Sequence, residues 1–298
     1  MSMPPDLVVV VRSATRPTVA MQAAATNPDR ALVRRRLTPF LHLLLARDLP
    51  DRTAYVNKEQ LDSWGVDPLE AWMHGAGVLD PSAGLEQLDD QVWGMACDAY
   101  SSSRLILPRW LQAFRDTVGD EPLAAVPHGG RVLVAGREHA HALLARAGRE
   151  YDHASIPVSP ALYTASALGE VRPWVPDPDH PARAAQRAAF ARLAQTEYQR
   201  QASILADLYE SPRFVPIATR EARDGTLLTV AHWRETDGPS VLPDADVTVL
   251  TPATGSPLAV ATGLLVQRLG LREWPELHPR RWQAPRWPDA ATWTGLMG

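Results

Sequence analysis

The sequence predicts an α+β protein with mixed or antiparallel sheets, flanking helices and two closely packed lobes. Strand-like runs such as residues 7–11 and helix-like segments follow one another without the regular strand–helix–strand repeat of a parallel α/β fold. The longest helical segment begins at Pro181, directly after a stretch rich in proline and aspartate over 171–181. We therefore expect an N-terminal α+β lobe over 1–170 and a C-terminal lobe over 181–298 with a long helix, a short antiparallel sheet and a tryptophan-rich tail.

The composition is that of a folded protein, since 45% of the 298 residues are hydrophobic and 21% are charged. The net charge of −4 argues against a nucleic-acid partner, because phosphate binding needs a surplus of lysine and arginine. The apolar run 7–11 is shorter than the ~7–15 residues of a secretory signal core, and no stretch approaches the ~20 apolar residues that span a membrane. We expect a soluble cytoplasmic protein without nucleic-acid or membrane partners.

Neither a redox pair nor a metal site is expected. Cys97 is the only cysteine, which excludes an intrachain disulfide, and its apolar surroundings favour burial as a small hydrophobic residue. His139 and His141 lie two residues apart on a predicted helix, where their side chains point about 200° away from each other and cannot share one ion. We predict no metal and no cofactor.

Capping residues before apolar runs with helical spacing predict the helices, and glycines mark several of their ends. The expected helices cover residues 27–45, 57–65, 67–75, 108–119, 136–148, 181–209 and 256–270. In the first of these, Asn27 and Pro28 supply the cap and the first helical position, and Pro39 is expected to kink the helix.

Apolar and β-branched runs bounded by turn residues predict the strands. The expected strands cover residues 7–11, 54–56, 92–97, 103–107, 122–127, 131–135, 214–219, 227–233 and 246–250. Two pairs form predicted hairpins, one joined by His128-Gly129-Gly130 and the other by Asp224-Gly225.

His128, on the first of these turns, is the candidate catalytic residue. Glycines let a backbone approach a ligand closely and direct amide donors at an anion, while the histidine acts as acid or base. Arg131, just after the turn, is a candidate to hold an anionic group. The alternative is a plain hairpin turn, which needs the same glycines and places no demand on the histidine.

A dense polar cluster over residues 98–104 supplies the other candidate ligand-binding residues, Tyr100, Ser103 and Arg104. Polar residues flanked by apolar sequence are typical of a recognition site in a cleft. They are equally typical of a serine-rich loop between two strands. No serine of the cluster lies in a Gly-x-Ser-x-Gly motif, so the pattern does not support nucleophilic catalysis.

The C-terminal tail interleaves tryptophan with arginine. It contains Trp274, Trp282, Trp287, Trp293, Arg280, Arg281 and Arg286. Such a pattern could stack a peptide or bases through aromatic and cation–π contacts. The alternative is a strap whose tryptophans fill grooves on the body of the protein.

A series of short motifs follows in order along residues 30–250. They are Tyr55-Val56-Asn57, Leu61 with Trp64-Gly65-Val66, Ser103-Arg104-Leu105, Val126-Pro127 with Val132-Leu133-Val134-Ala135-Gly136, Ser159-Pro160 with Leu162-Tyr163, His232-Trp233, and Leu242-Pro243-Asp244-Ala245-Asp246. In order and spacing they resemble the YtpQ-like family of uncharacterised bacterial cytosolic proteins. The resemblance implies an α+β fold and cytoplasmic residence, and it brings no catalytic residues with it.

Two functions from different classes remain open. The first is a non-catalytic binding or regulatory protein that recognises a protein or peptide partner, because catalytic signatures are missing and tryptophan is abundant. The alternative is an enzyme that acts on a small polar or anionic substrate in an inter-lobe cleft, with His128 as acid or base and Arg104 or Arg131 on the anionic group.

Overall fold

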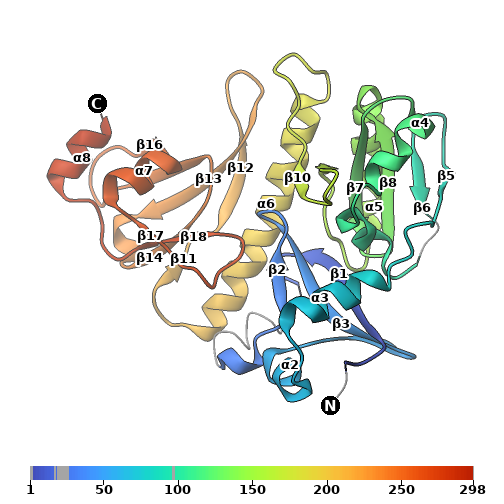
Figure 1. The fold of residues 1–298 in the computed structure, drawn as a ribbon. Coiled ribbons are helices and arrows are strands. Elements are labelled where there is room, and N and C mark those ends of the chain that lie inside the picture. The colour runs from blue at the N-terminus through green and yellow to red at the C-terminus, as the bar shows by residue number, and fades with distance from the viewer. Residues whose placement is uncertain (1–2, 17, 19–26, 96–97, 298) are drawn as a thin grey trace. The chain divides into compact units, whose positions relative to one another are not determined.

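The computed structural model describes residues 3–16, 18, 27–95 and 98–297 (Figure 1). The chain divides into two compact units, Met1–Phe190 and Ala191–Gly298, here called unit 1 and unit 2. Both units combine helices with antiparallel or mixed sheets, which confirms the prediction of an α+β fold. The predicted burial of Cys97 falls outside the described residues.

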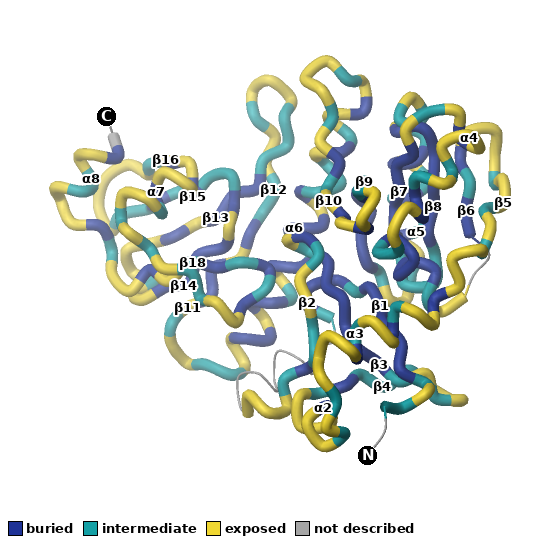
Figure 2. The backbone as a smooth tube through the Cα atoms, viewed as in Figure 1, coloured by how far each residue is buried: buried dark blue, intermediate teal, exposed yellow. Residues whose placement is uncertain are grey.

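The first sheet of unit 1 is antiparallel and centred on β3, with β1 on one side and β2 and β4 on the other. Its strands are β1 (Leu7–Ser13), β2 (Arg34–Arg36), β3 (Leu41–Leu49) and β4 (Arg52–Tyr55). The predicted strand at 7–11 is confirmed, and its five apolar residues are buried without a break. Figure 2 colours the backbone of the chain by burial.

The helix predicted over 27–45 is wrong. Asn27 caps only a single 3₁₀ turn, η1 (Pro28–Arg30), and the chain then forms β2 and β3. Every residue from Leu41 to Ala46 is buried, whereas a helix packed on a sheet would bury only one of its faces. Pro39 lies in the turn between the two strands, where the Leu41 amide donates to the side-chain hydroxyl of Thr38 at 3.1 Å.

The second sheet of unit 1 has six antiparallel strands in the order β10-β9-β7-β8-β6-β5. Their bounds are β5 (Leu85–Gln87), β6 (Trp93–Met95), β7 (Pro122–His128), β8 (Arg131–Gly136), β9 (Leu162–Ala165) and β10 (Val171–Pro173). The predicted hairpin at His128-Gly129-Gly130 is confirmed as the β7–β8 connection. The start of the expected linker is in fact β10, which pairs with β9.

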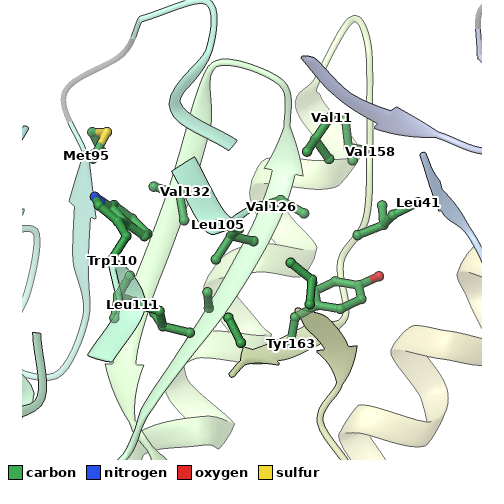
Figure 3. Close-up of a cluster of buried hydrophobic side chains, with 14 of the residues drawn as sticks. Val11, Leu41, Met95, Leu105, Trp110, Leu111, Val126, Val132, Val158 and Tyr163 are labelled. Carbon is green, nitrogen blue, oxygen red and sulfur yellow. The ribbon is translucent and has the colours of Figure 1, made fainter. Parts of the chain in front are cut away.

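Both faces of this sheet are covered, which explains why β7 and β8 are apolar at nearly every position. Alternate residues of a strand point to opposite faces. One set, including Leu123 and Leu133, packs on α5 (Ala140–His153). The other set packs on the 3₁₀ helices η2 (Ser101–Ile106) and η3 (Leu111–Phe114), and Figure 3 shows Leu105 of η2 beside Val126 and Val132.

Three predicted elements around this sheet differ from the structure. Residues 103–107 lie in and just after η2 rather than in a strand, because their backbone bonds are the short-range bonds of a 3₁₀ turn. The helix expected over 108–119 is split into η3 and α4 (Arg115–Val118). Gly148 does not end α5, which continues to His153 because Tyr151 of its last turn is buried. A short 3₁₀ helix, η4 (Arg137–His139), precedes α5.

Two further helices of unit 1 begin where predicted, with Asn57 capping α2 (Lys58–Trp64) and Asp67 capping α3 (Pro68–Gly77). The residues of α3 buried in the protein are small, Ala71 and Gly75. A Cβ at Gly75 would lie 3.1 Å from the backbone carbon of Val8, so the helix backbone rests directly on β1.

Unit 2 contains two four-stranded sheets, in the orders β11-β14-β18-β17 and β12-β13-β15-β16. The strands are β11 (Arg213–Phe214), β12 (Ile217–Glu221), β13 (Leu227–Arg234), β14 (Ser240–Pro243), β15 (Val247–Thr251), β16 (Leu258–Ala261), β17 (Arg272–Glu273) and β18 (Arg281–Ala284). The helical elements are α6 (Arg183–Leu208), which is the predicted long helix and contains the division between the units, η5 (Glu235–Asp237), α7 (Thr262–Leu269) and α8 (Ala290–Met297).

Two predictions for this part of the chain are resolved. The hairpin at Asp224-Gly225 is confirmed as the antiparallel β12–β13 connection. The helix expected from residue 256 begins only at Thr262, since residues 258–261 pair with β15 as strand β16; it ends at Gly270 as predicted, in the left-handed conformation with φ 59°.

The C-terminal tail is part of the body of unit 2. Strand β18 lies between β14 and β17, and the Trp287 ring packs on the buried Trp233 ring at 4.9 Å. Arg281 of β18 is fully buried and donates to the side chain of Gln201 and to three backbone carbonyls. These contacts favour the strap interpretation of the tail over that of a free ligand-binding arm.

Candidate functional site

The β7–β8 turn forms one wall of a hollow of about 430 Å³, here called the glycine-turn hollow. Its lining includes His128 and Gly129 from the turn, Arg12 from β1, and His153 and Ser155 from the end of α5 and the segment after it. All of its lining residues belong to unit 1. The hollow therefore collects one arginine and two histidines around a glycine turn.

Arg12 lies so close to Gly129 that a larger residue there would have to displace the arginine side chain. A Cβ at residue 129 would come within 2.5 Å of Arg12 Nη1. The guanidinium is held in this position because Nε donates to the Tyr55 hydroxyl at 3.1 Å and Nη1 donates to the Val11 carbonyl at 2.8 Å. These bonds use two of the five N–H groups of a guanidinium.

The two histidines differ in their surroundings. The pKa of His128 is lowered, chiefly because partial burial disfavours the charged ring; Arg131 lowers it further and Glu150 acts in the opposite direction. Nδ1 of His153 lies 2.7 Å from the Arg149 carbonyl oxygen. Because a carbonyl only accepts, Nδ1 must carry the proton, and the neutral ring then presents Nε2 as an acceptor.

The polar cluster over 98–104 supports the turn rather than lining the hollow. The Ser102 amide and hydroxyl both donate to the Gly129 carbonyl, at 3.2 and 2.7 Å. A Cβ at Gly130 would lie 2.9 Å from the Asp98 carbonyl oxygen, so the second glycine is also required by close packing. Ser103 accepts a hydrogen bond from the Val11 amide at 3.0 Å, which ties η2 to β1 beside Arg12.

Arg104 and Arg131 are both engaged with the protein. Arg104 pairs with Asp98 at 2.7 Å and donates through Nε to the Asp80 carbonyl at 2.9 Å. Arg131 pairs with Glu150 at 3.2 Å and donates through Nη1 to the Met95 carbonyl at 3.0 Å. Neither lines the glycine-turn hollow, so the cation available to a ligand there is Arg12.

Tyr100 also lies outside this hollow. Its hydroxyl is buried beside β3 and β4, and burial together with the carboxylate of Asp48 raises its pKa to about 12. A phenol in that state stays neutral at physiological pH and does not act as a base. The structure thus brings His128 together with Arg12, and places Tyr100, Ser103, Arg104 and Arg131 in the surrounding framework.

A second hollow of about 530 Å³ in unit 1, here called the α3 groove, lies along helix α3. Leu69, Trp72, Met73 and Ala76 line it, at the spacing i, i+3, i+4 and i+7 of one helix face. Leu69 and Met73 are 63% and 67% exposed. The large apolar side chains of α3 therefore face the groove, while its small residues face the sheet.

The rest of the lining of the α3 groove combines apolar and basic residues. Leu168, which is 80% exposed, and Ile106 are among its apolar residues. Arg35 and Arg36 of β2 are exposed at the rim. Arg172 also lies there, in an exposed ion pair with Glu170 at 2.8 Å.

Sequence reasoning missed Arg12 and the α3 groove. Arg12 is more than a hundred residues from the turn that it contacts, and no local signal connects them. The apolar spacing on α3 is visible in the sequence but normally marks the buried face of a helix. Within the described residues, no group of three or more metal-ligating side chains is positioned to hold an ion, and none of the described helices combines the length and apolarity needed to cross a membrane.

Comparison of the chain with family models, curated proteins and solved structures finds no match. The resemblance to the YtpQ-like family accordingly stays a prediction.

Proposed function

We propose that this chain is a non-catalytic binding or regulatory protein that recognises an amphipathic, acidic segment of a protein or peptide partner in the α3 groove. The observation that carries the proposal is the orientation of α3. Ala71 and Gly75 contact the sheet, and the larger Leu69, Trp72 and Met73 line the groove.

Exposure of large apolar side chains is unfavourable in water, at about 25 cal/mol for each Å² that could be buried. Contiguous apolar surface with a polar rim is characteristic of interaction sites. Partners that bind such grooves present anchors at positions i, i+3, i+4 and i+7 of a helix. The groove offers apolar side chains to such anchors, contributed by α3 and by Leu168.

The charge of the rim sets the chemistry of the partner. Arg35, Arg36 and Arg172 outnumber Glu170, the acidic residue among the lining residues. A partner with carboxylates beside its apolar face would find complementary charge there, which speeds association and makes it sensitive to salt. We therefore commit to an acidic amphipathic segment as the occupant.

The test is a comparison of proteins retained from native lysate by the wild-type chain, a Met73→Asp variant and a Val175→Asp control. Val175 is 82% exposed and lies outside the groove, so the control adds the same charge at an equally exposed apolar site. The proposal requires a partner that is retained by wild type and control, lost with Met73→Asp and released by salt. Recovery of the chain alone, or the same partners with all three baits, contradicts it.

A second candidate function is supported by the contact between Arg12 and Gly129. It is an enzyme that acts on a small polar or anionic substrate, with His128 as acid or base and Arg12, in place of Arg104 or Arg131, on the anionic group. The site would be the glycine-turn hollow of unit 1 rather than an inter-lobe cleft.

This candidate is tested by NMR titration of the His128 ring with inorganic phosphate and with acetate. Saturable shifts of the His128 signals that disappear in an Arg12→Gln variant support it. Signals that do not respond to either anion, or that respond equally in the variant, contradict it.

A further inference from the structure

A third hollow, of about 600 Å³, lies wholly in unit 2 and contains three arginines. Its lining includes Arg268, Arg272 and Arg286, together with Trp287 and Gln283. It is distinct from both hollows described above, which belong to unit 1. Here it is called the three-arginine hollow.

The three arginines come from three different elements that the local backbone brings together. Arg268 lies in the last turn of α7, and Gly270 in its left-handed conformation turns the chain directly into β17. Arg272 of β17 is the cross-strand neighbour of Gln283 in β18, so both side chains lie on the same face of the sheet. Arg286 is the second residue after the end of β18.

The charges of these arginines are not neutralised by neighbouring acids. In the part of the chain that the structure describes, no ion pair involves Arg268, Arg272 or Arg286. The one carboxylate that lines the hollow, Asp289, caps α8 by accepting a hydrogen bond from the Thr292 amide at 2.8 Å. That hydrogen bond lowers the pKa of Asp289, and Arg286 lowers it further, so three positive charges face one negative charge.

Trp287 is the aromatic residue of the lining. Trp287 packs on the buried Trp233 at 4.9 Å and on Trp293 at 5.8 Å, which fixes its position beside Arg286. The volume of the hollow lies within the ~300–1,000 Å³ typical of small-molecule sites. Guanidinium groups bind phosphate oxygens with two parallel hydrogen bonds each, and several together suit a ligand with more than one negative charge.

We propose that the three-arginine hollow is a binding site for a small phosphate-bearing molecule, in which Arg268, Arg272 and Arg286 contact the phosphate oxygens and Trp287 forms the wall beside them. A small ligand fits better than a nucleic acid because the chain as a whole carries a net charge of −4. The proposal concerns unit 2 and is independent of partner binding in the α3 groove.

The experiment measures binding of inorganic pyrophosphate to the full-length protein by isothermal titration calorimetry at low and high salt. The variants are Arg272→Gln and Arg286→Gln, and the control is Arg220→Gln, an exposed arginine of β12 outside the hollow. We expect saturable binding to wild type and control, at least tenfold weaker binding to each of the two variants, and weakening with salt. Thermal melts without ligand verify that every variant is folded.

Three results would overturn the proposal. The first is the absence of saturable pyrophosphate binding to the wild-type protein. The second is an equal loss of affinity in the Arg220→Gln control, which would show that binding follows net charge rather than this hollow. The third is tighter binding of a single-stranded oligonucleotide than of pyrophosphate with loss in the same two variants, which would identify a nucleic-acid surface instead.

Discussion

Arg12 Nη1 lies so close to the α-carbon of Gly129 that a Cβ there would be only 2.5 Å away. The two residues come from β1 and from the β7–β8 turn, and so they join the two sheets of unit 1. Arg12, whose guanidinium is anchored by Tyr55 and the Val11 carbonyl, is one of the residues that line the glycine-turn hollow. A larger residue at position 129 would have to displace the Arg12 side chain.

Gly129→Ala should therefore destabilise the protein by about 1–3 kcal/mol, the usual cost of overpacking, because the added methyl group must displace Arg12. Gly148→Ala is the matched control, since a Cβ there meets nothing within 4 Å and the residue lies inside α5. It should stabilise by about 0.5–1 kcal/mol. Urea denaturation measures both changes, and equal effects would show that Arg12 does not restrict residue 129.

Arg281 should be irreplaceable in unit 2 because its guanidinium donates hydrogen bonds to four acceptors. Nε donates to Gln201 Oε1 at 2.5 Å, and the two Nη atoms donate to the carbonyls of Tyr198, Val215 and Val241. Arg281→Met should cost about 2–4 kcal/mol, since buried acceptors lose their donors. Arg281→Lys should cost at least as much, because an ammonium keeps the charge but not the planar fork. Denaturant unfolding with unit 2 tryptophan fluorescence tests this, and wild-type stability of the lysine variant would contradict it.

His128 should make stability depend on pH at mildly acidic values. Its pKa is lowered in the folded protein, mainly by burial, so the folded state binds the proton less readily than the unfolded state. This contribution of His128 to the free energy of unfolding is fully present at pH values above the pKa of about 6.5 in the unfolded state. It is lost as the pH falls through the lower pKa of the folded state. Unfolding free energies of wild type and His128→Gln between pH 8 and pH 5 should converge as the pH falls; parallel curves would rule the linkage out.

Introducing an aspartate should hardly change the stability on one face of α3 and should lower it strongly on the other. Met73→Asp, on the exposed face, should change the free energy of unfolding by less than about 0.5 kcal/mol. Ala71→Asp, fully buried against the sheet, should cost more than about 3 kcal/mol because it buries an unpaired charge. Thermal and urea unfolding of the two variants check this. A large loss with Met73→Asp would mean that the groove face is part of the core.

Local signals predicted the elements that depend on local structure. The glycines of the β7–β8 turn, the caps of α2 and α3, and the long helical segment of α6 all appear where the sequence indicated. The segment 27–45 shows the limit of such signals. Its cap at Asn27 is real but supports one turn, because Leu41–Leu49 pairs with strands on both sides and its first six residues are buried. Pairing between distant strands outweighed the local preference.

The candidate site likewise contains one residue that local sequence predicts and one that it does not. His128 could be selected because it stands on a recognisable glycine turn. Arg12 could not, because its place against Gly129 follows from how the two sheets of unit 1 are arranged. Arg104 and Arg131 looked available in the sequence, and only the structure supplies their partners Asp98 and Glu150.

Strand β18 has a consequence for synthesis of the protein on the ribosome. It lies between β14 and β17, yet it follows β14 by roughly 40 residues in the chain. At translation rates of about 5–20 residues per second, β18 is synthesised about 2–8 s after β14. During that interval the carbonyls of Val215 and Val241 also lack the hydrogen bonds that Arg281 donates to them in the folded protein. Unit 2 is therefore completed late and all at once, when the tryptophan-rich tail emerges.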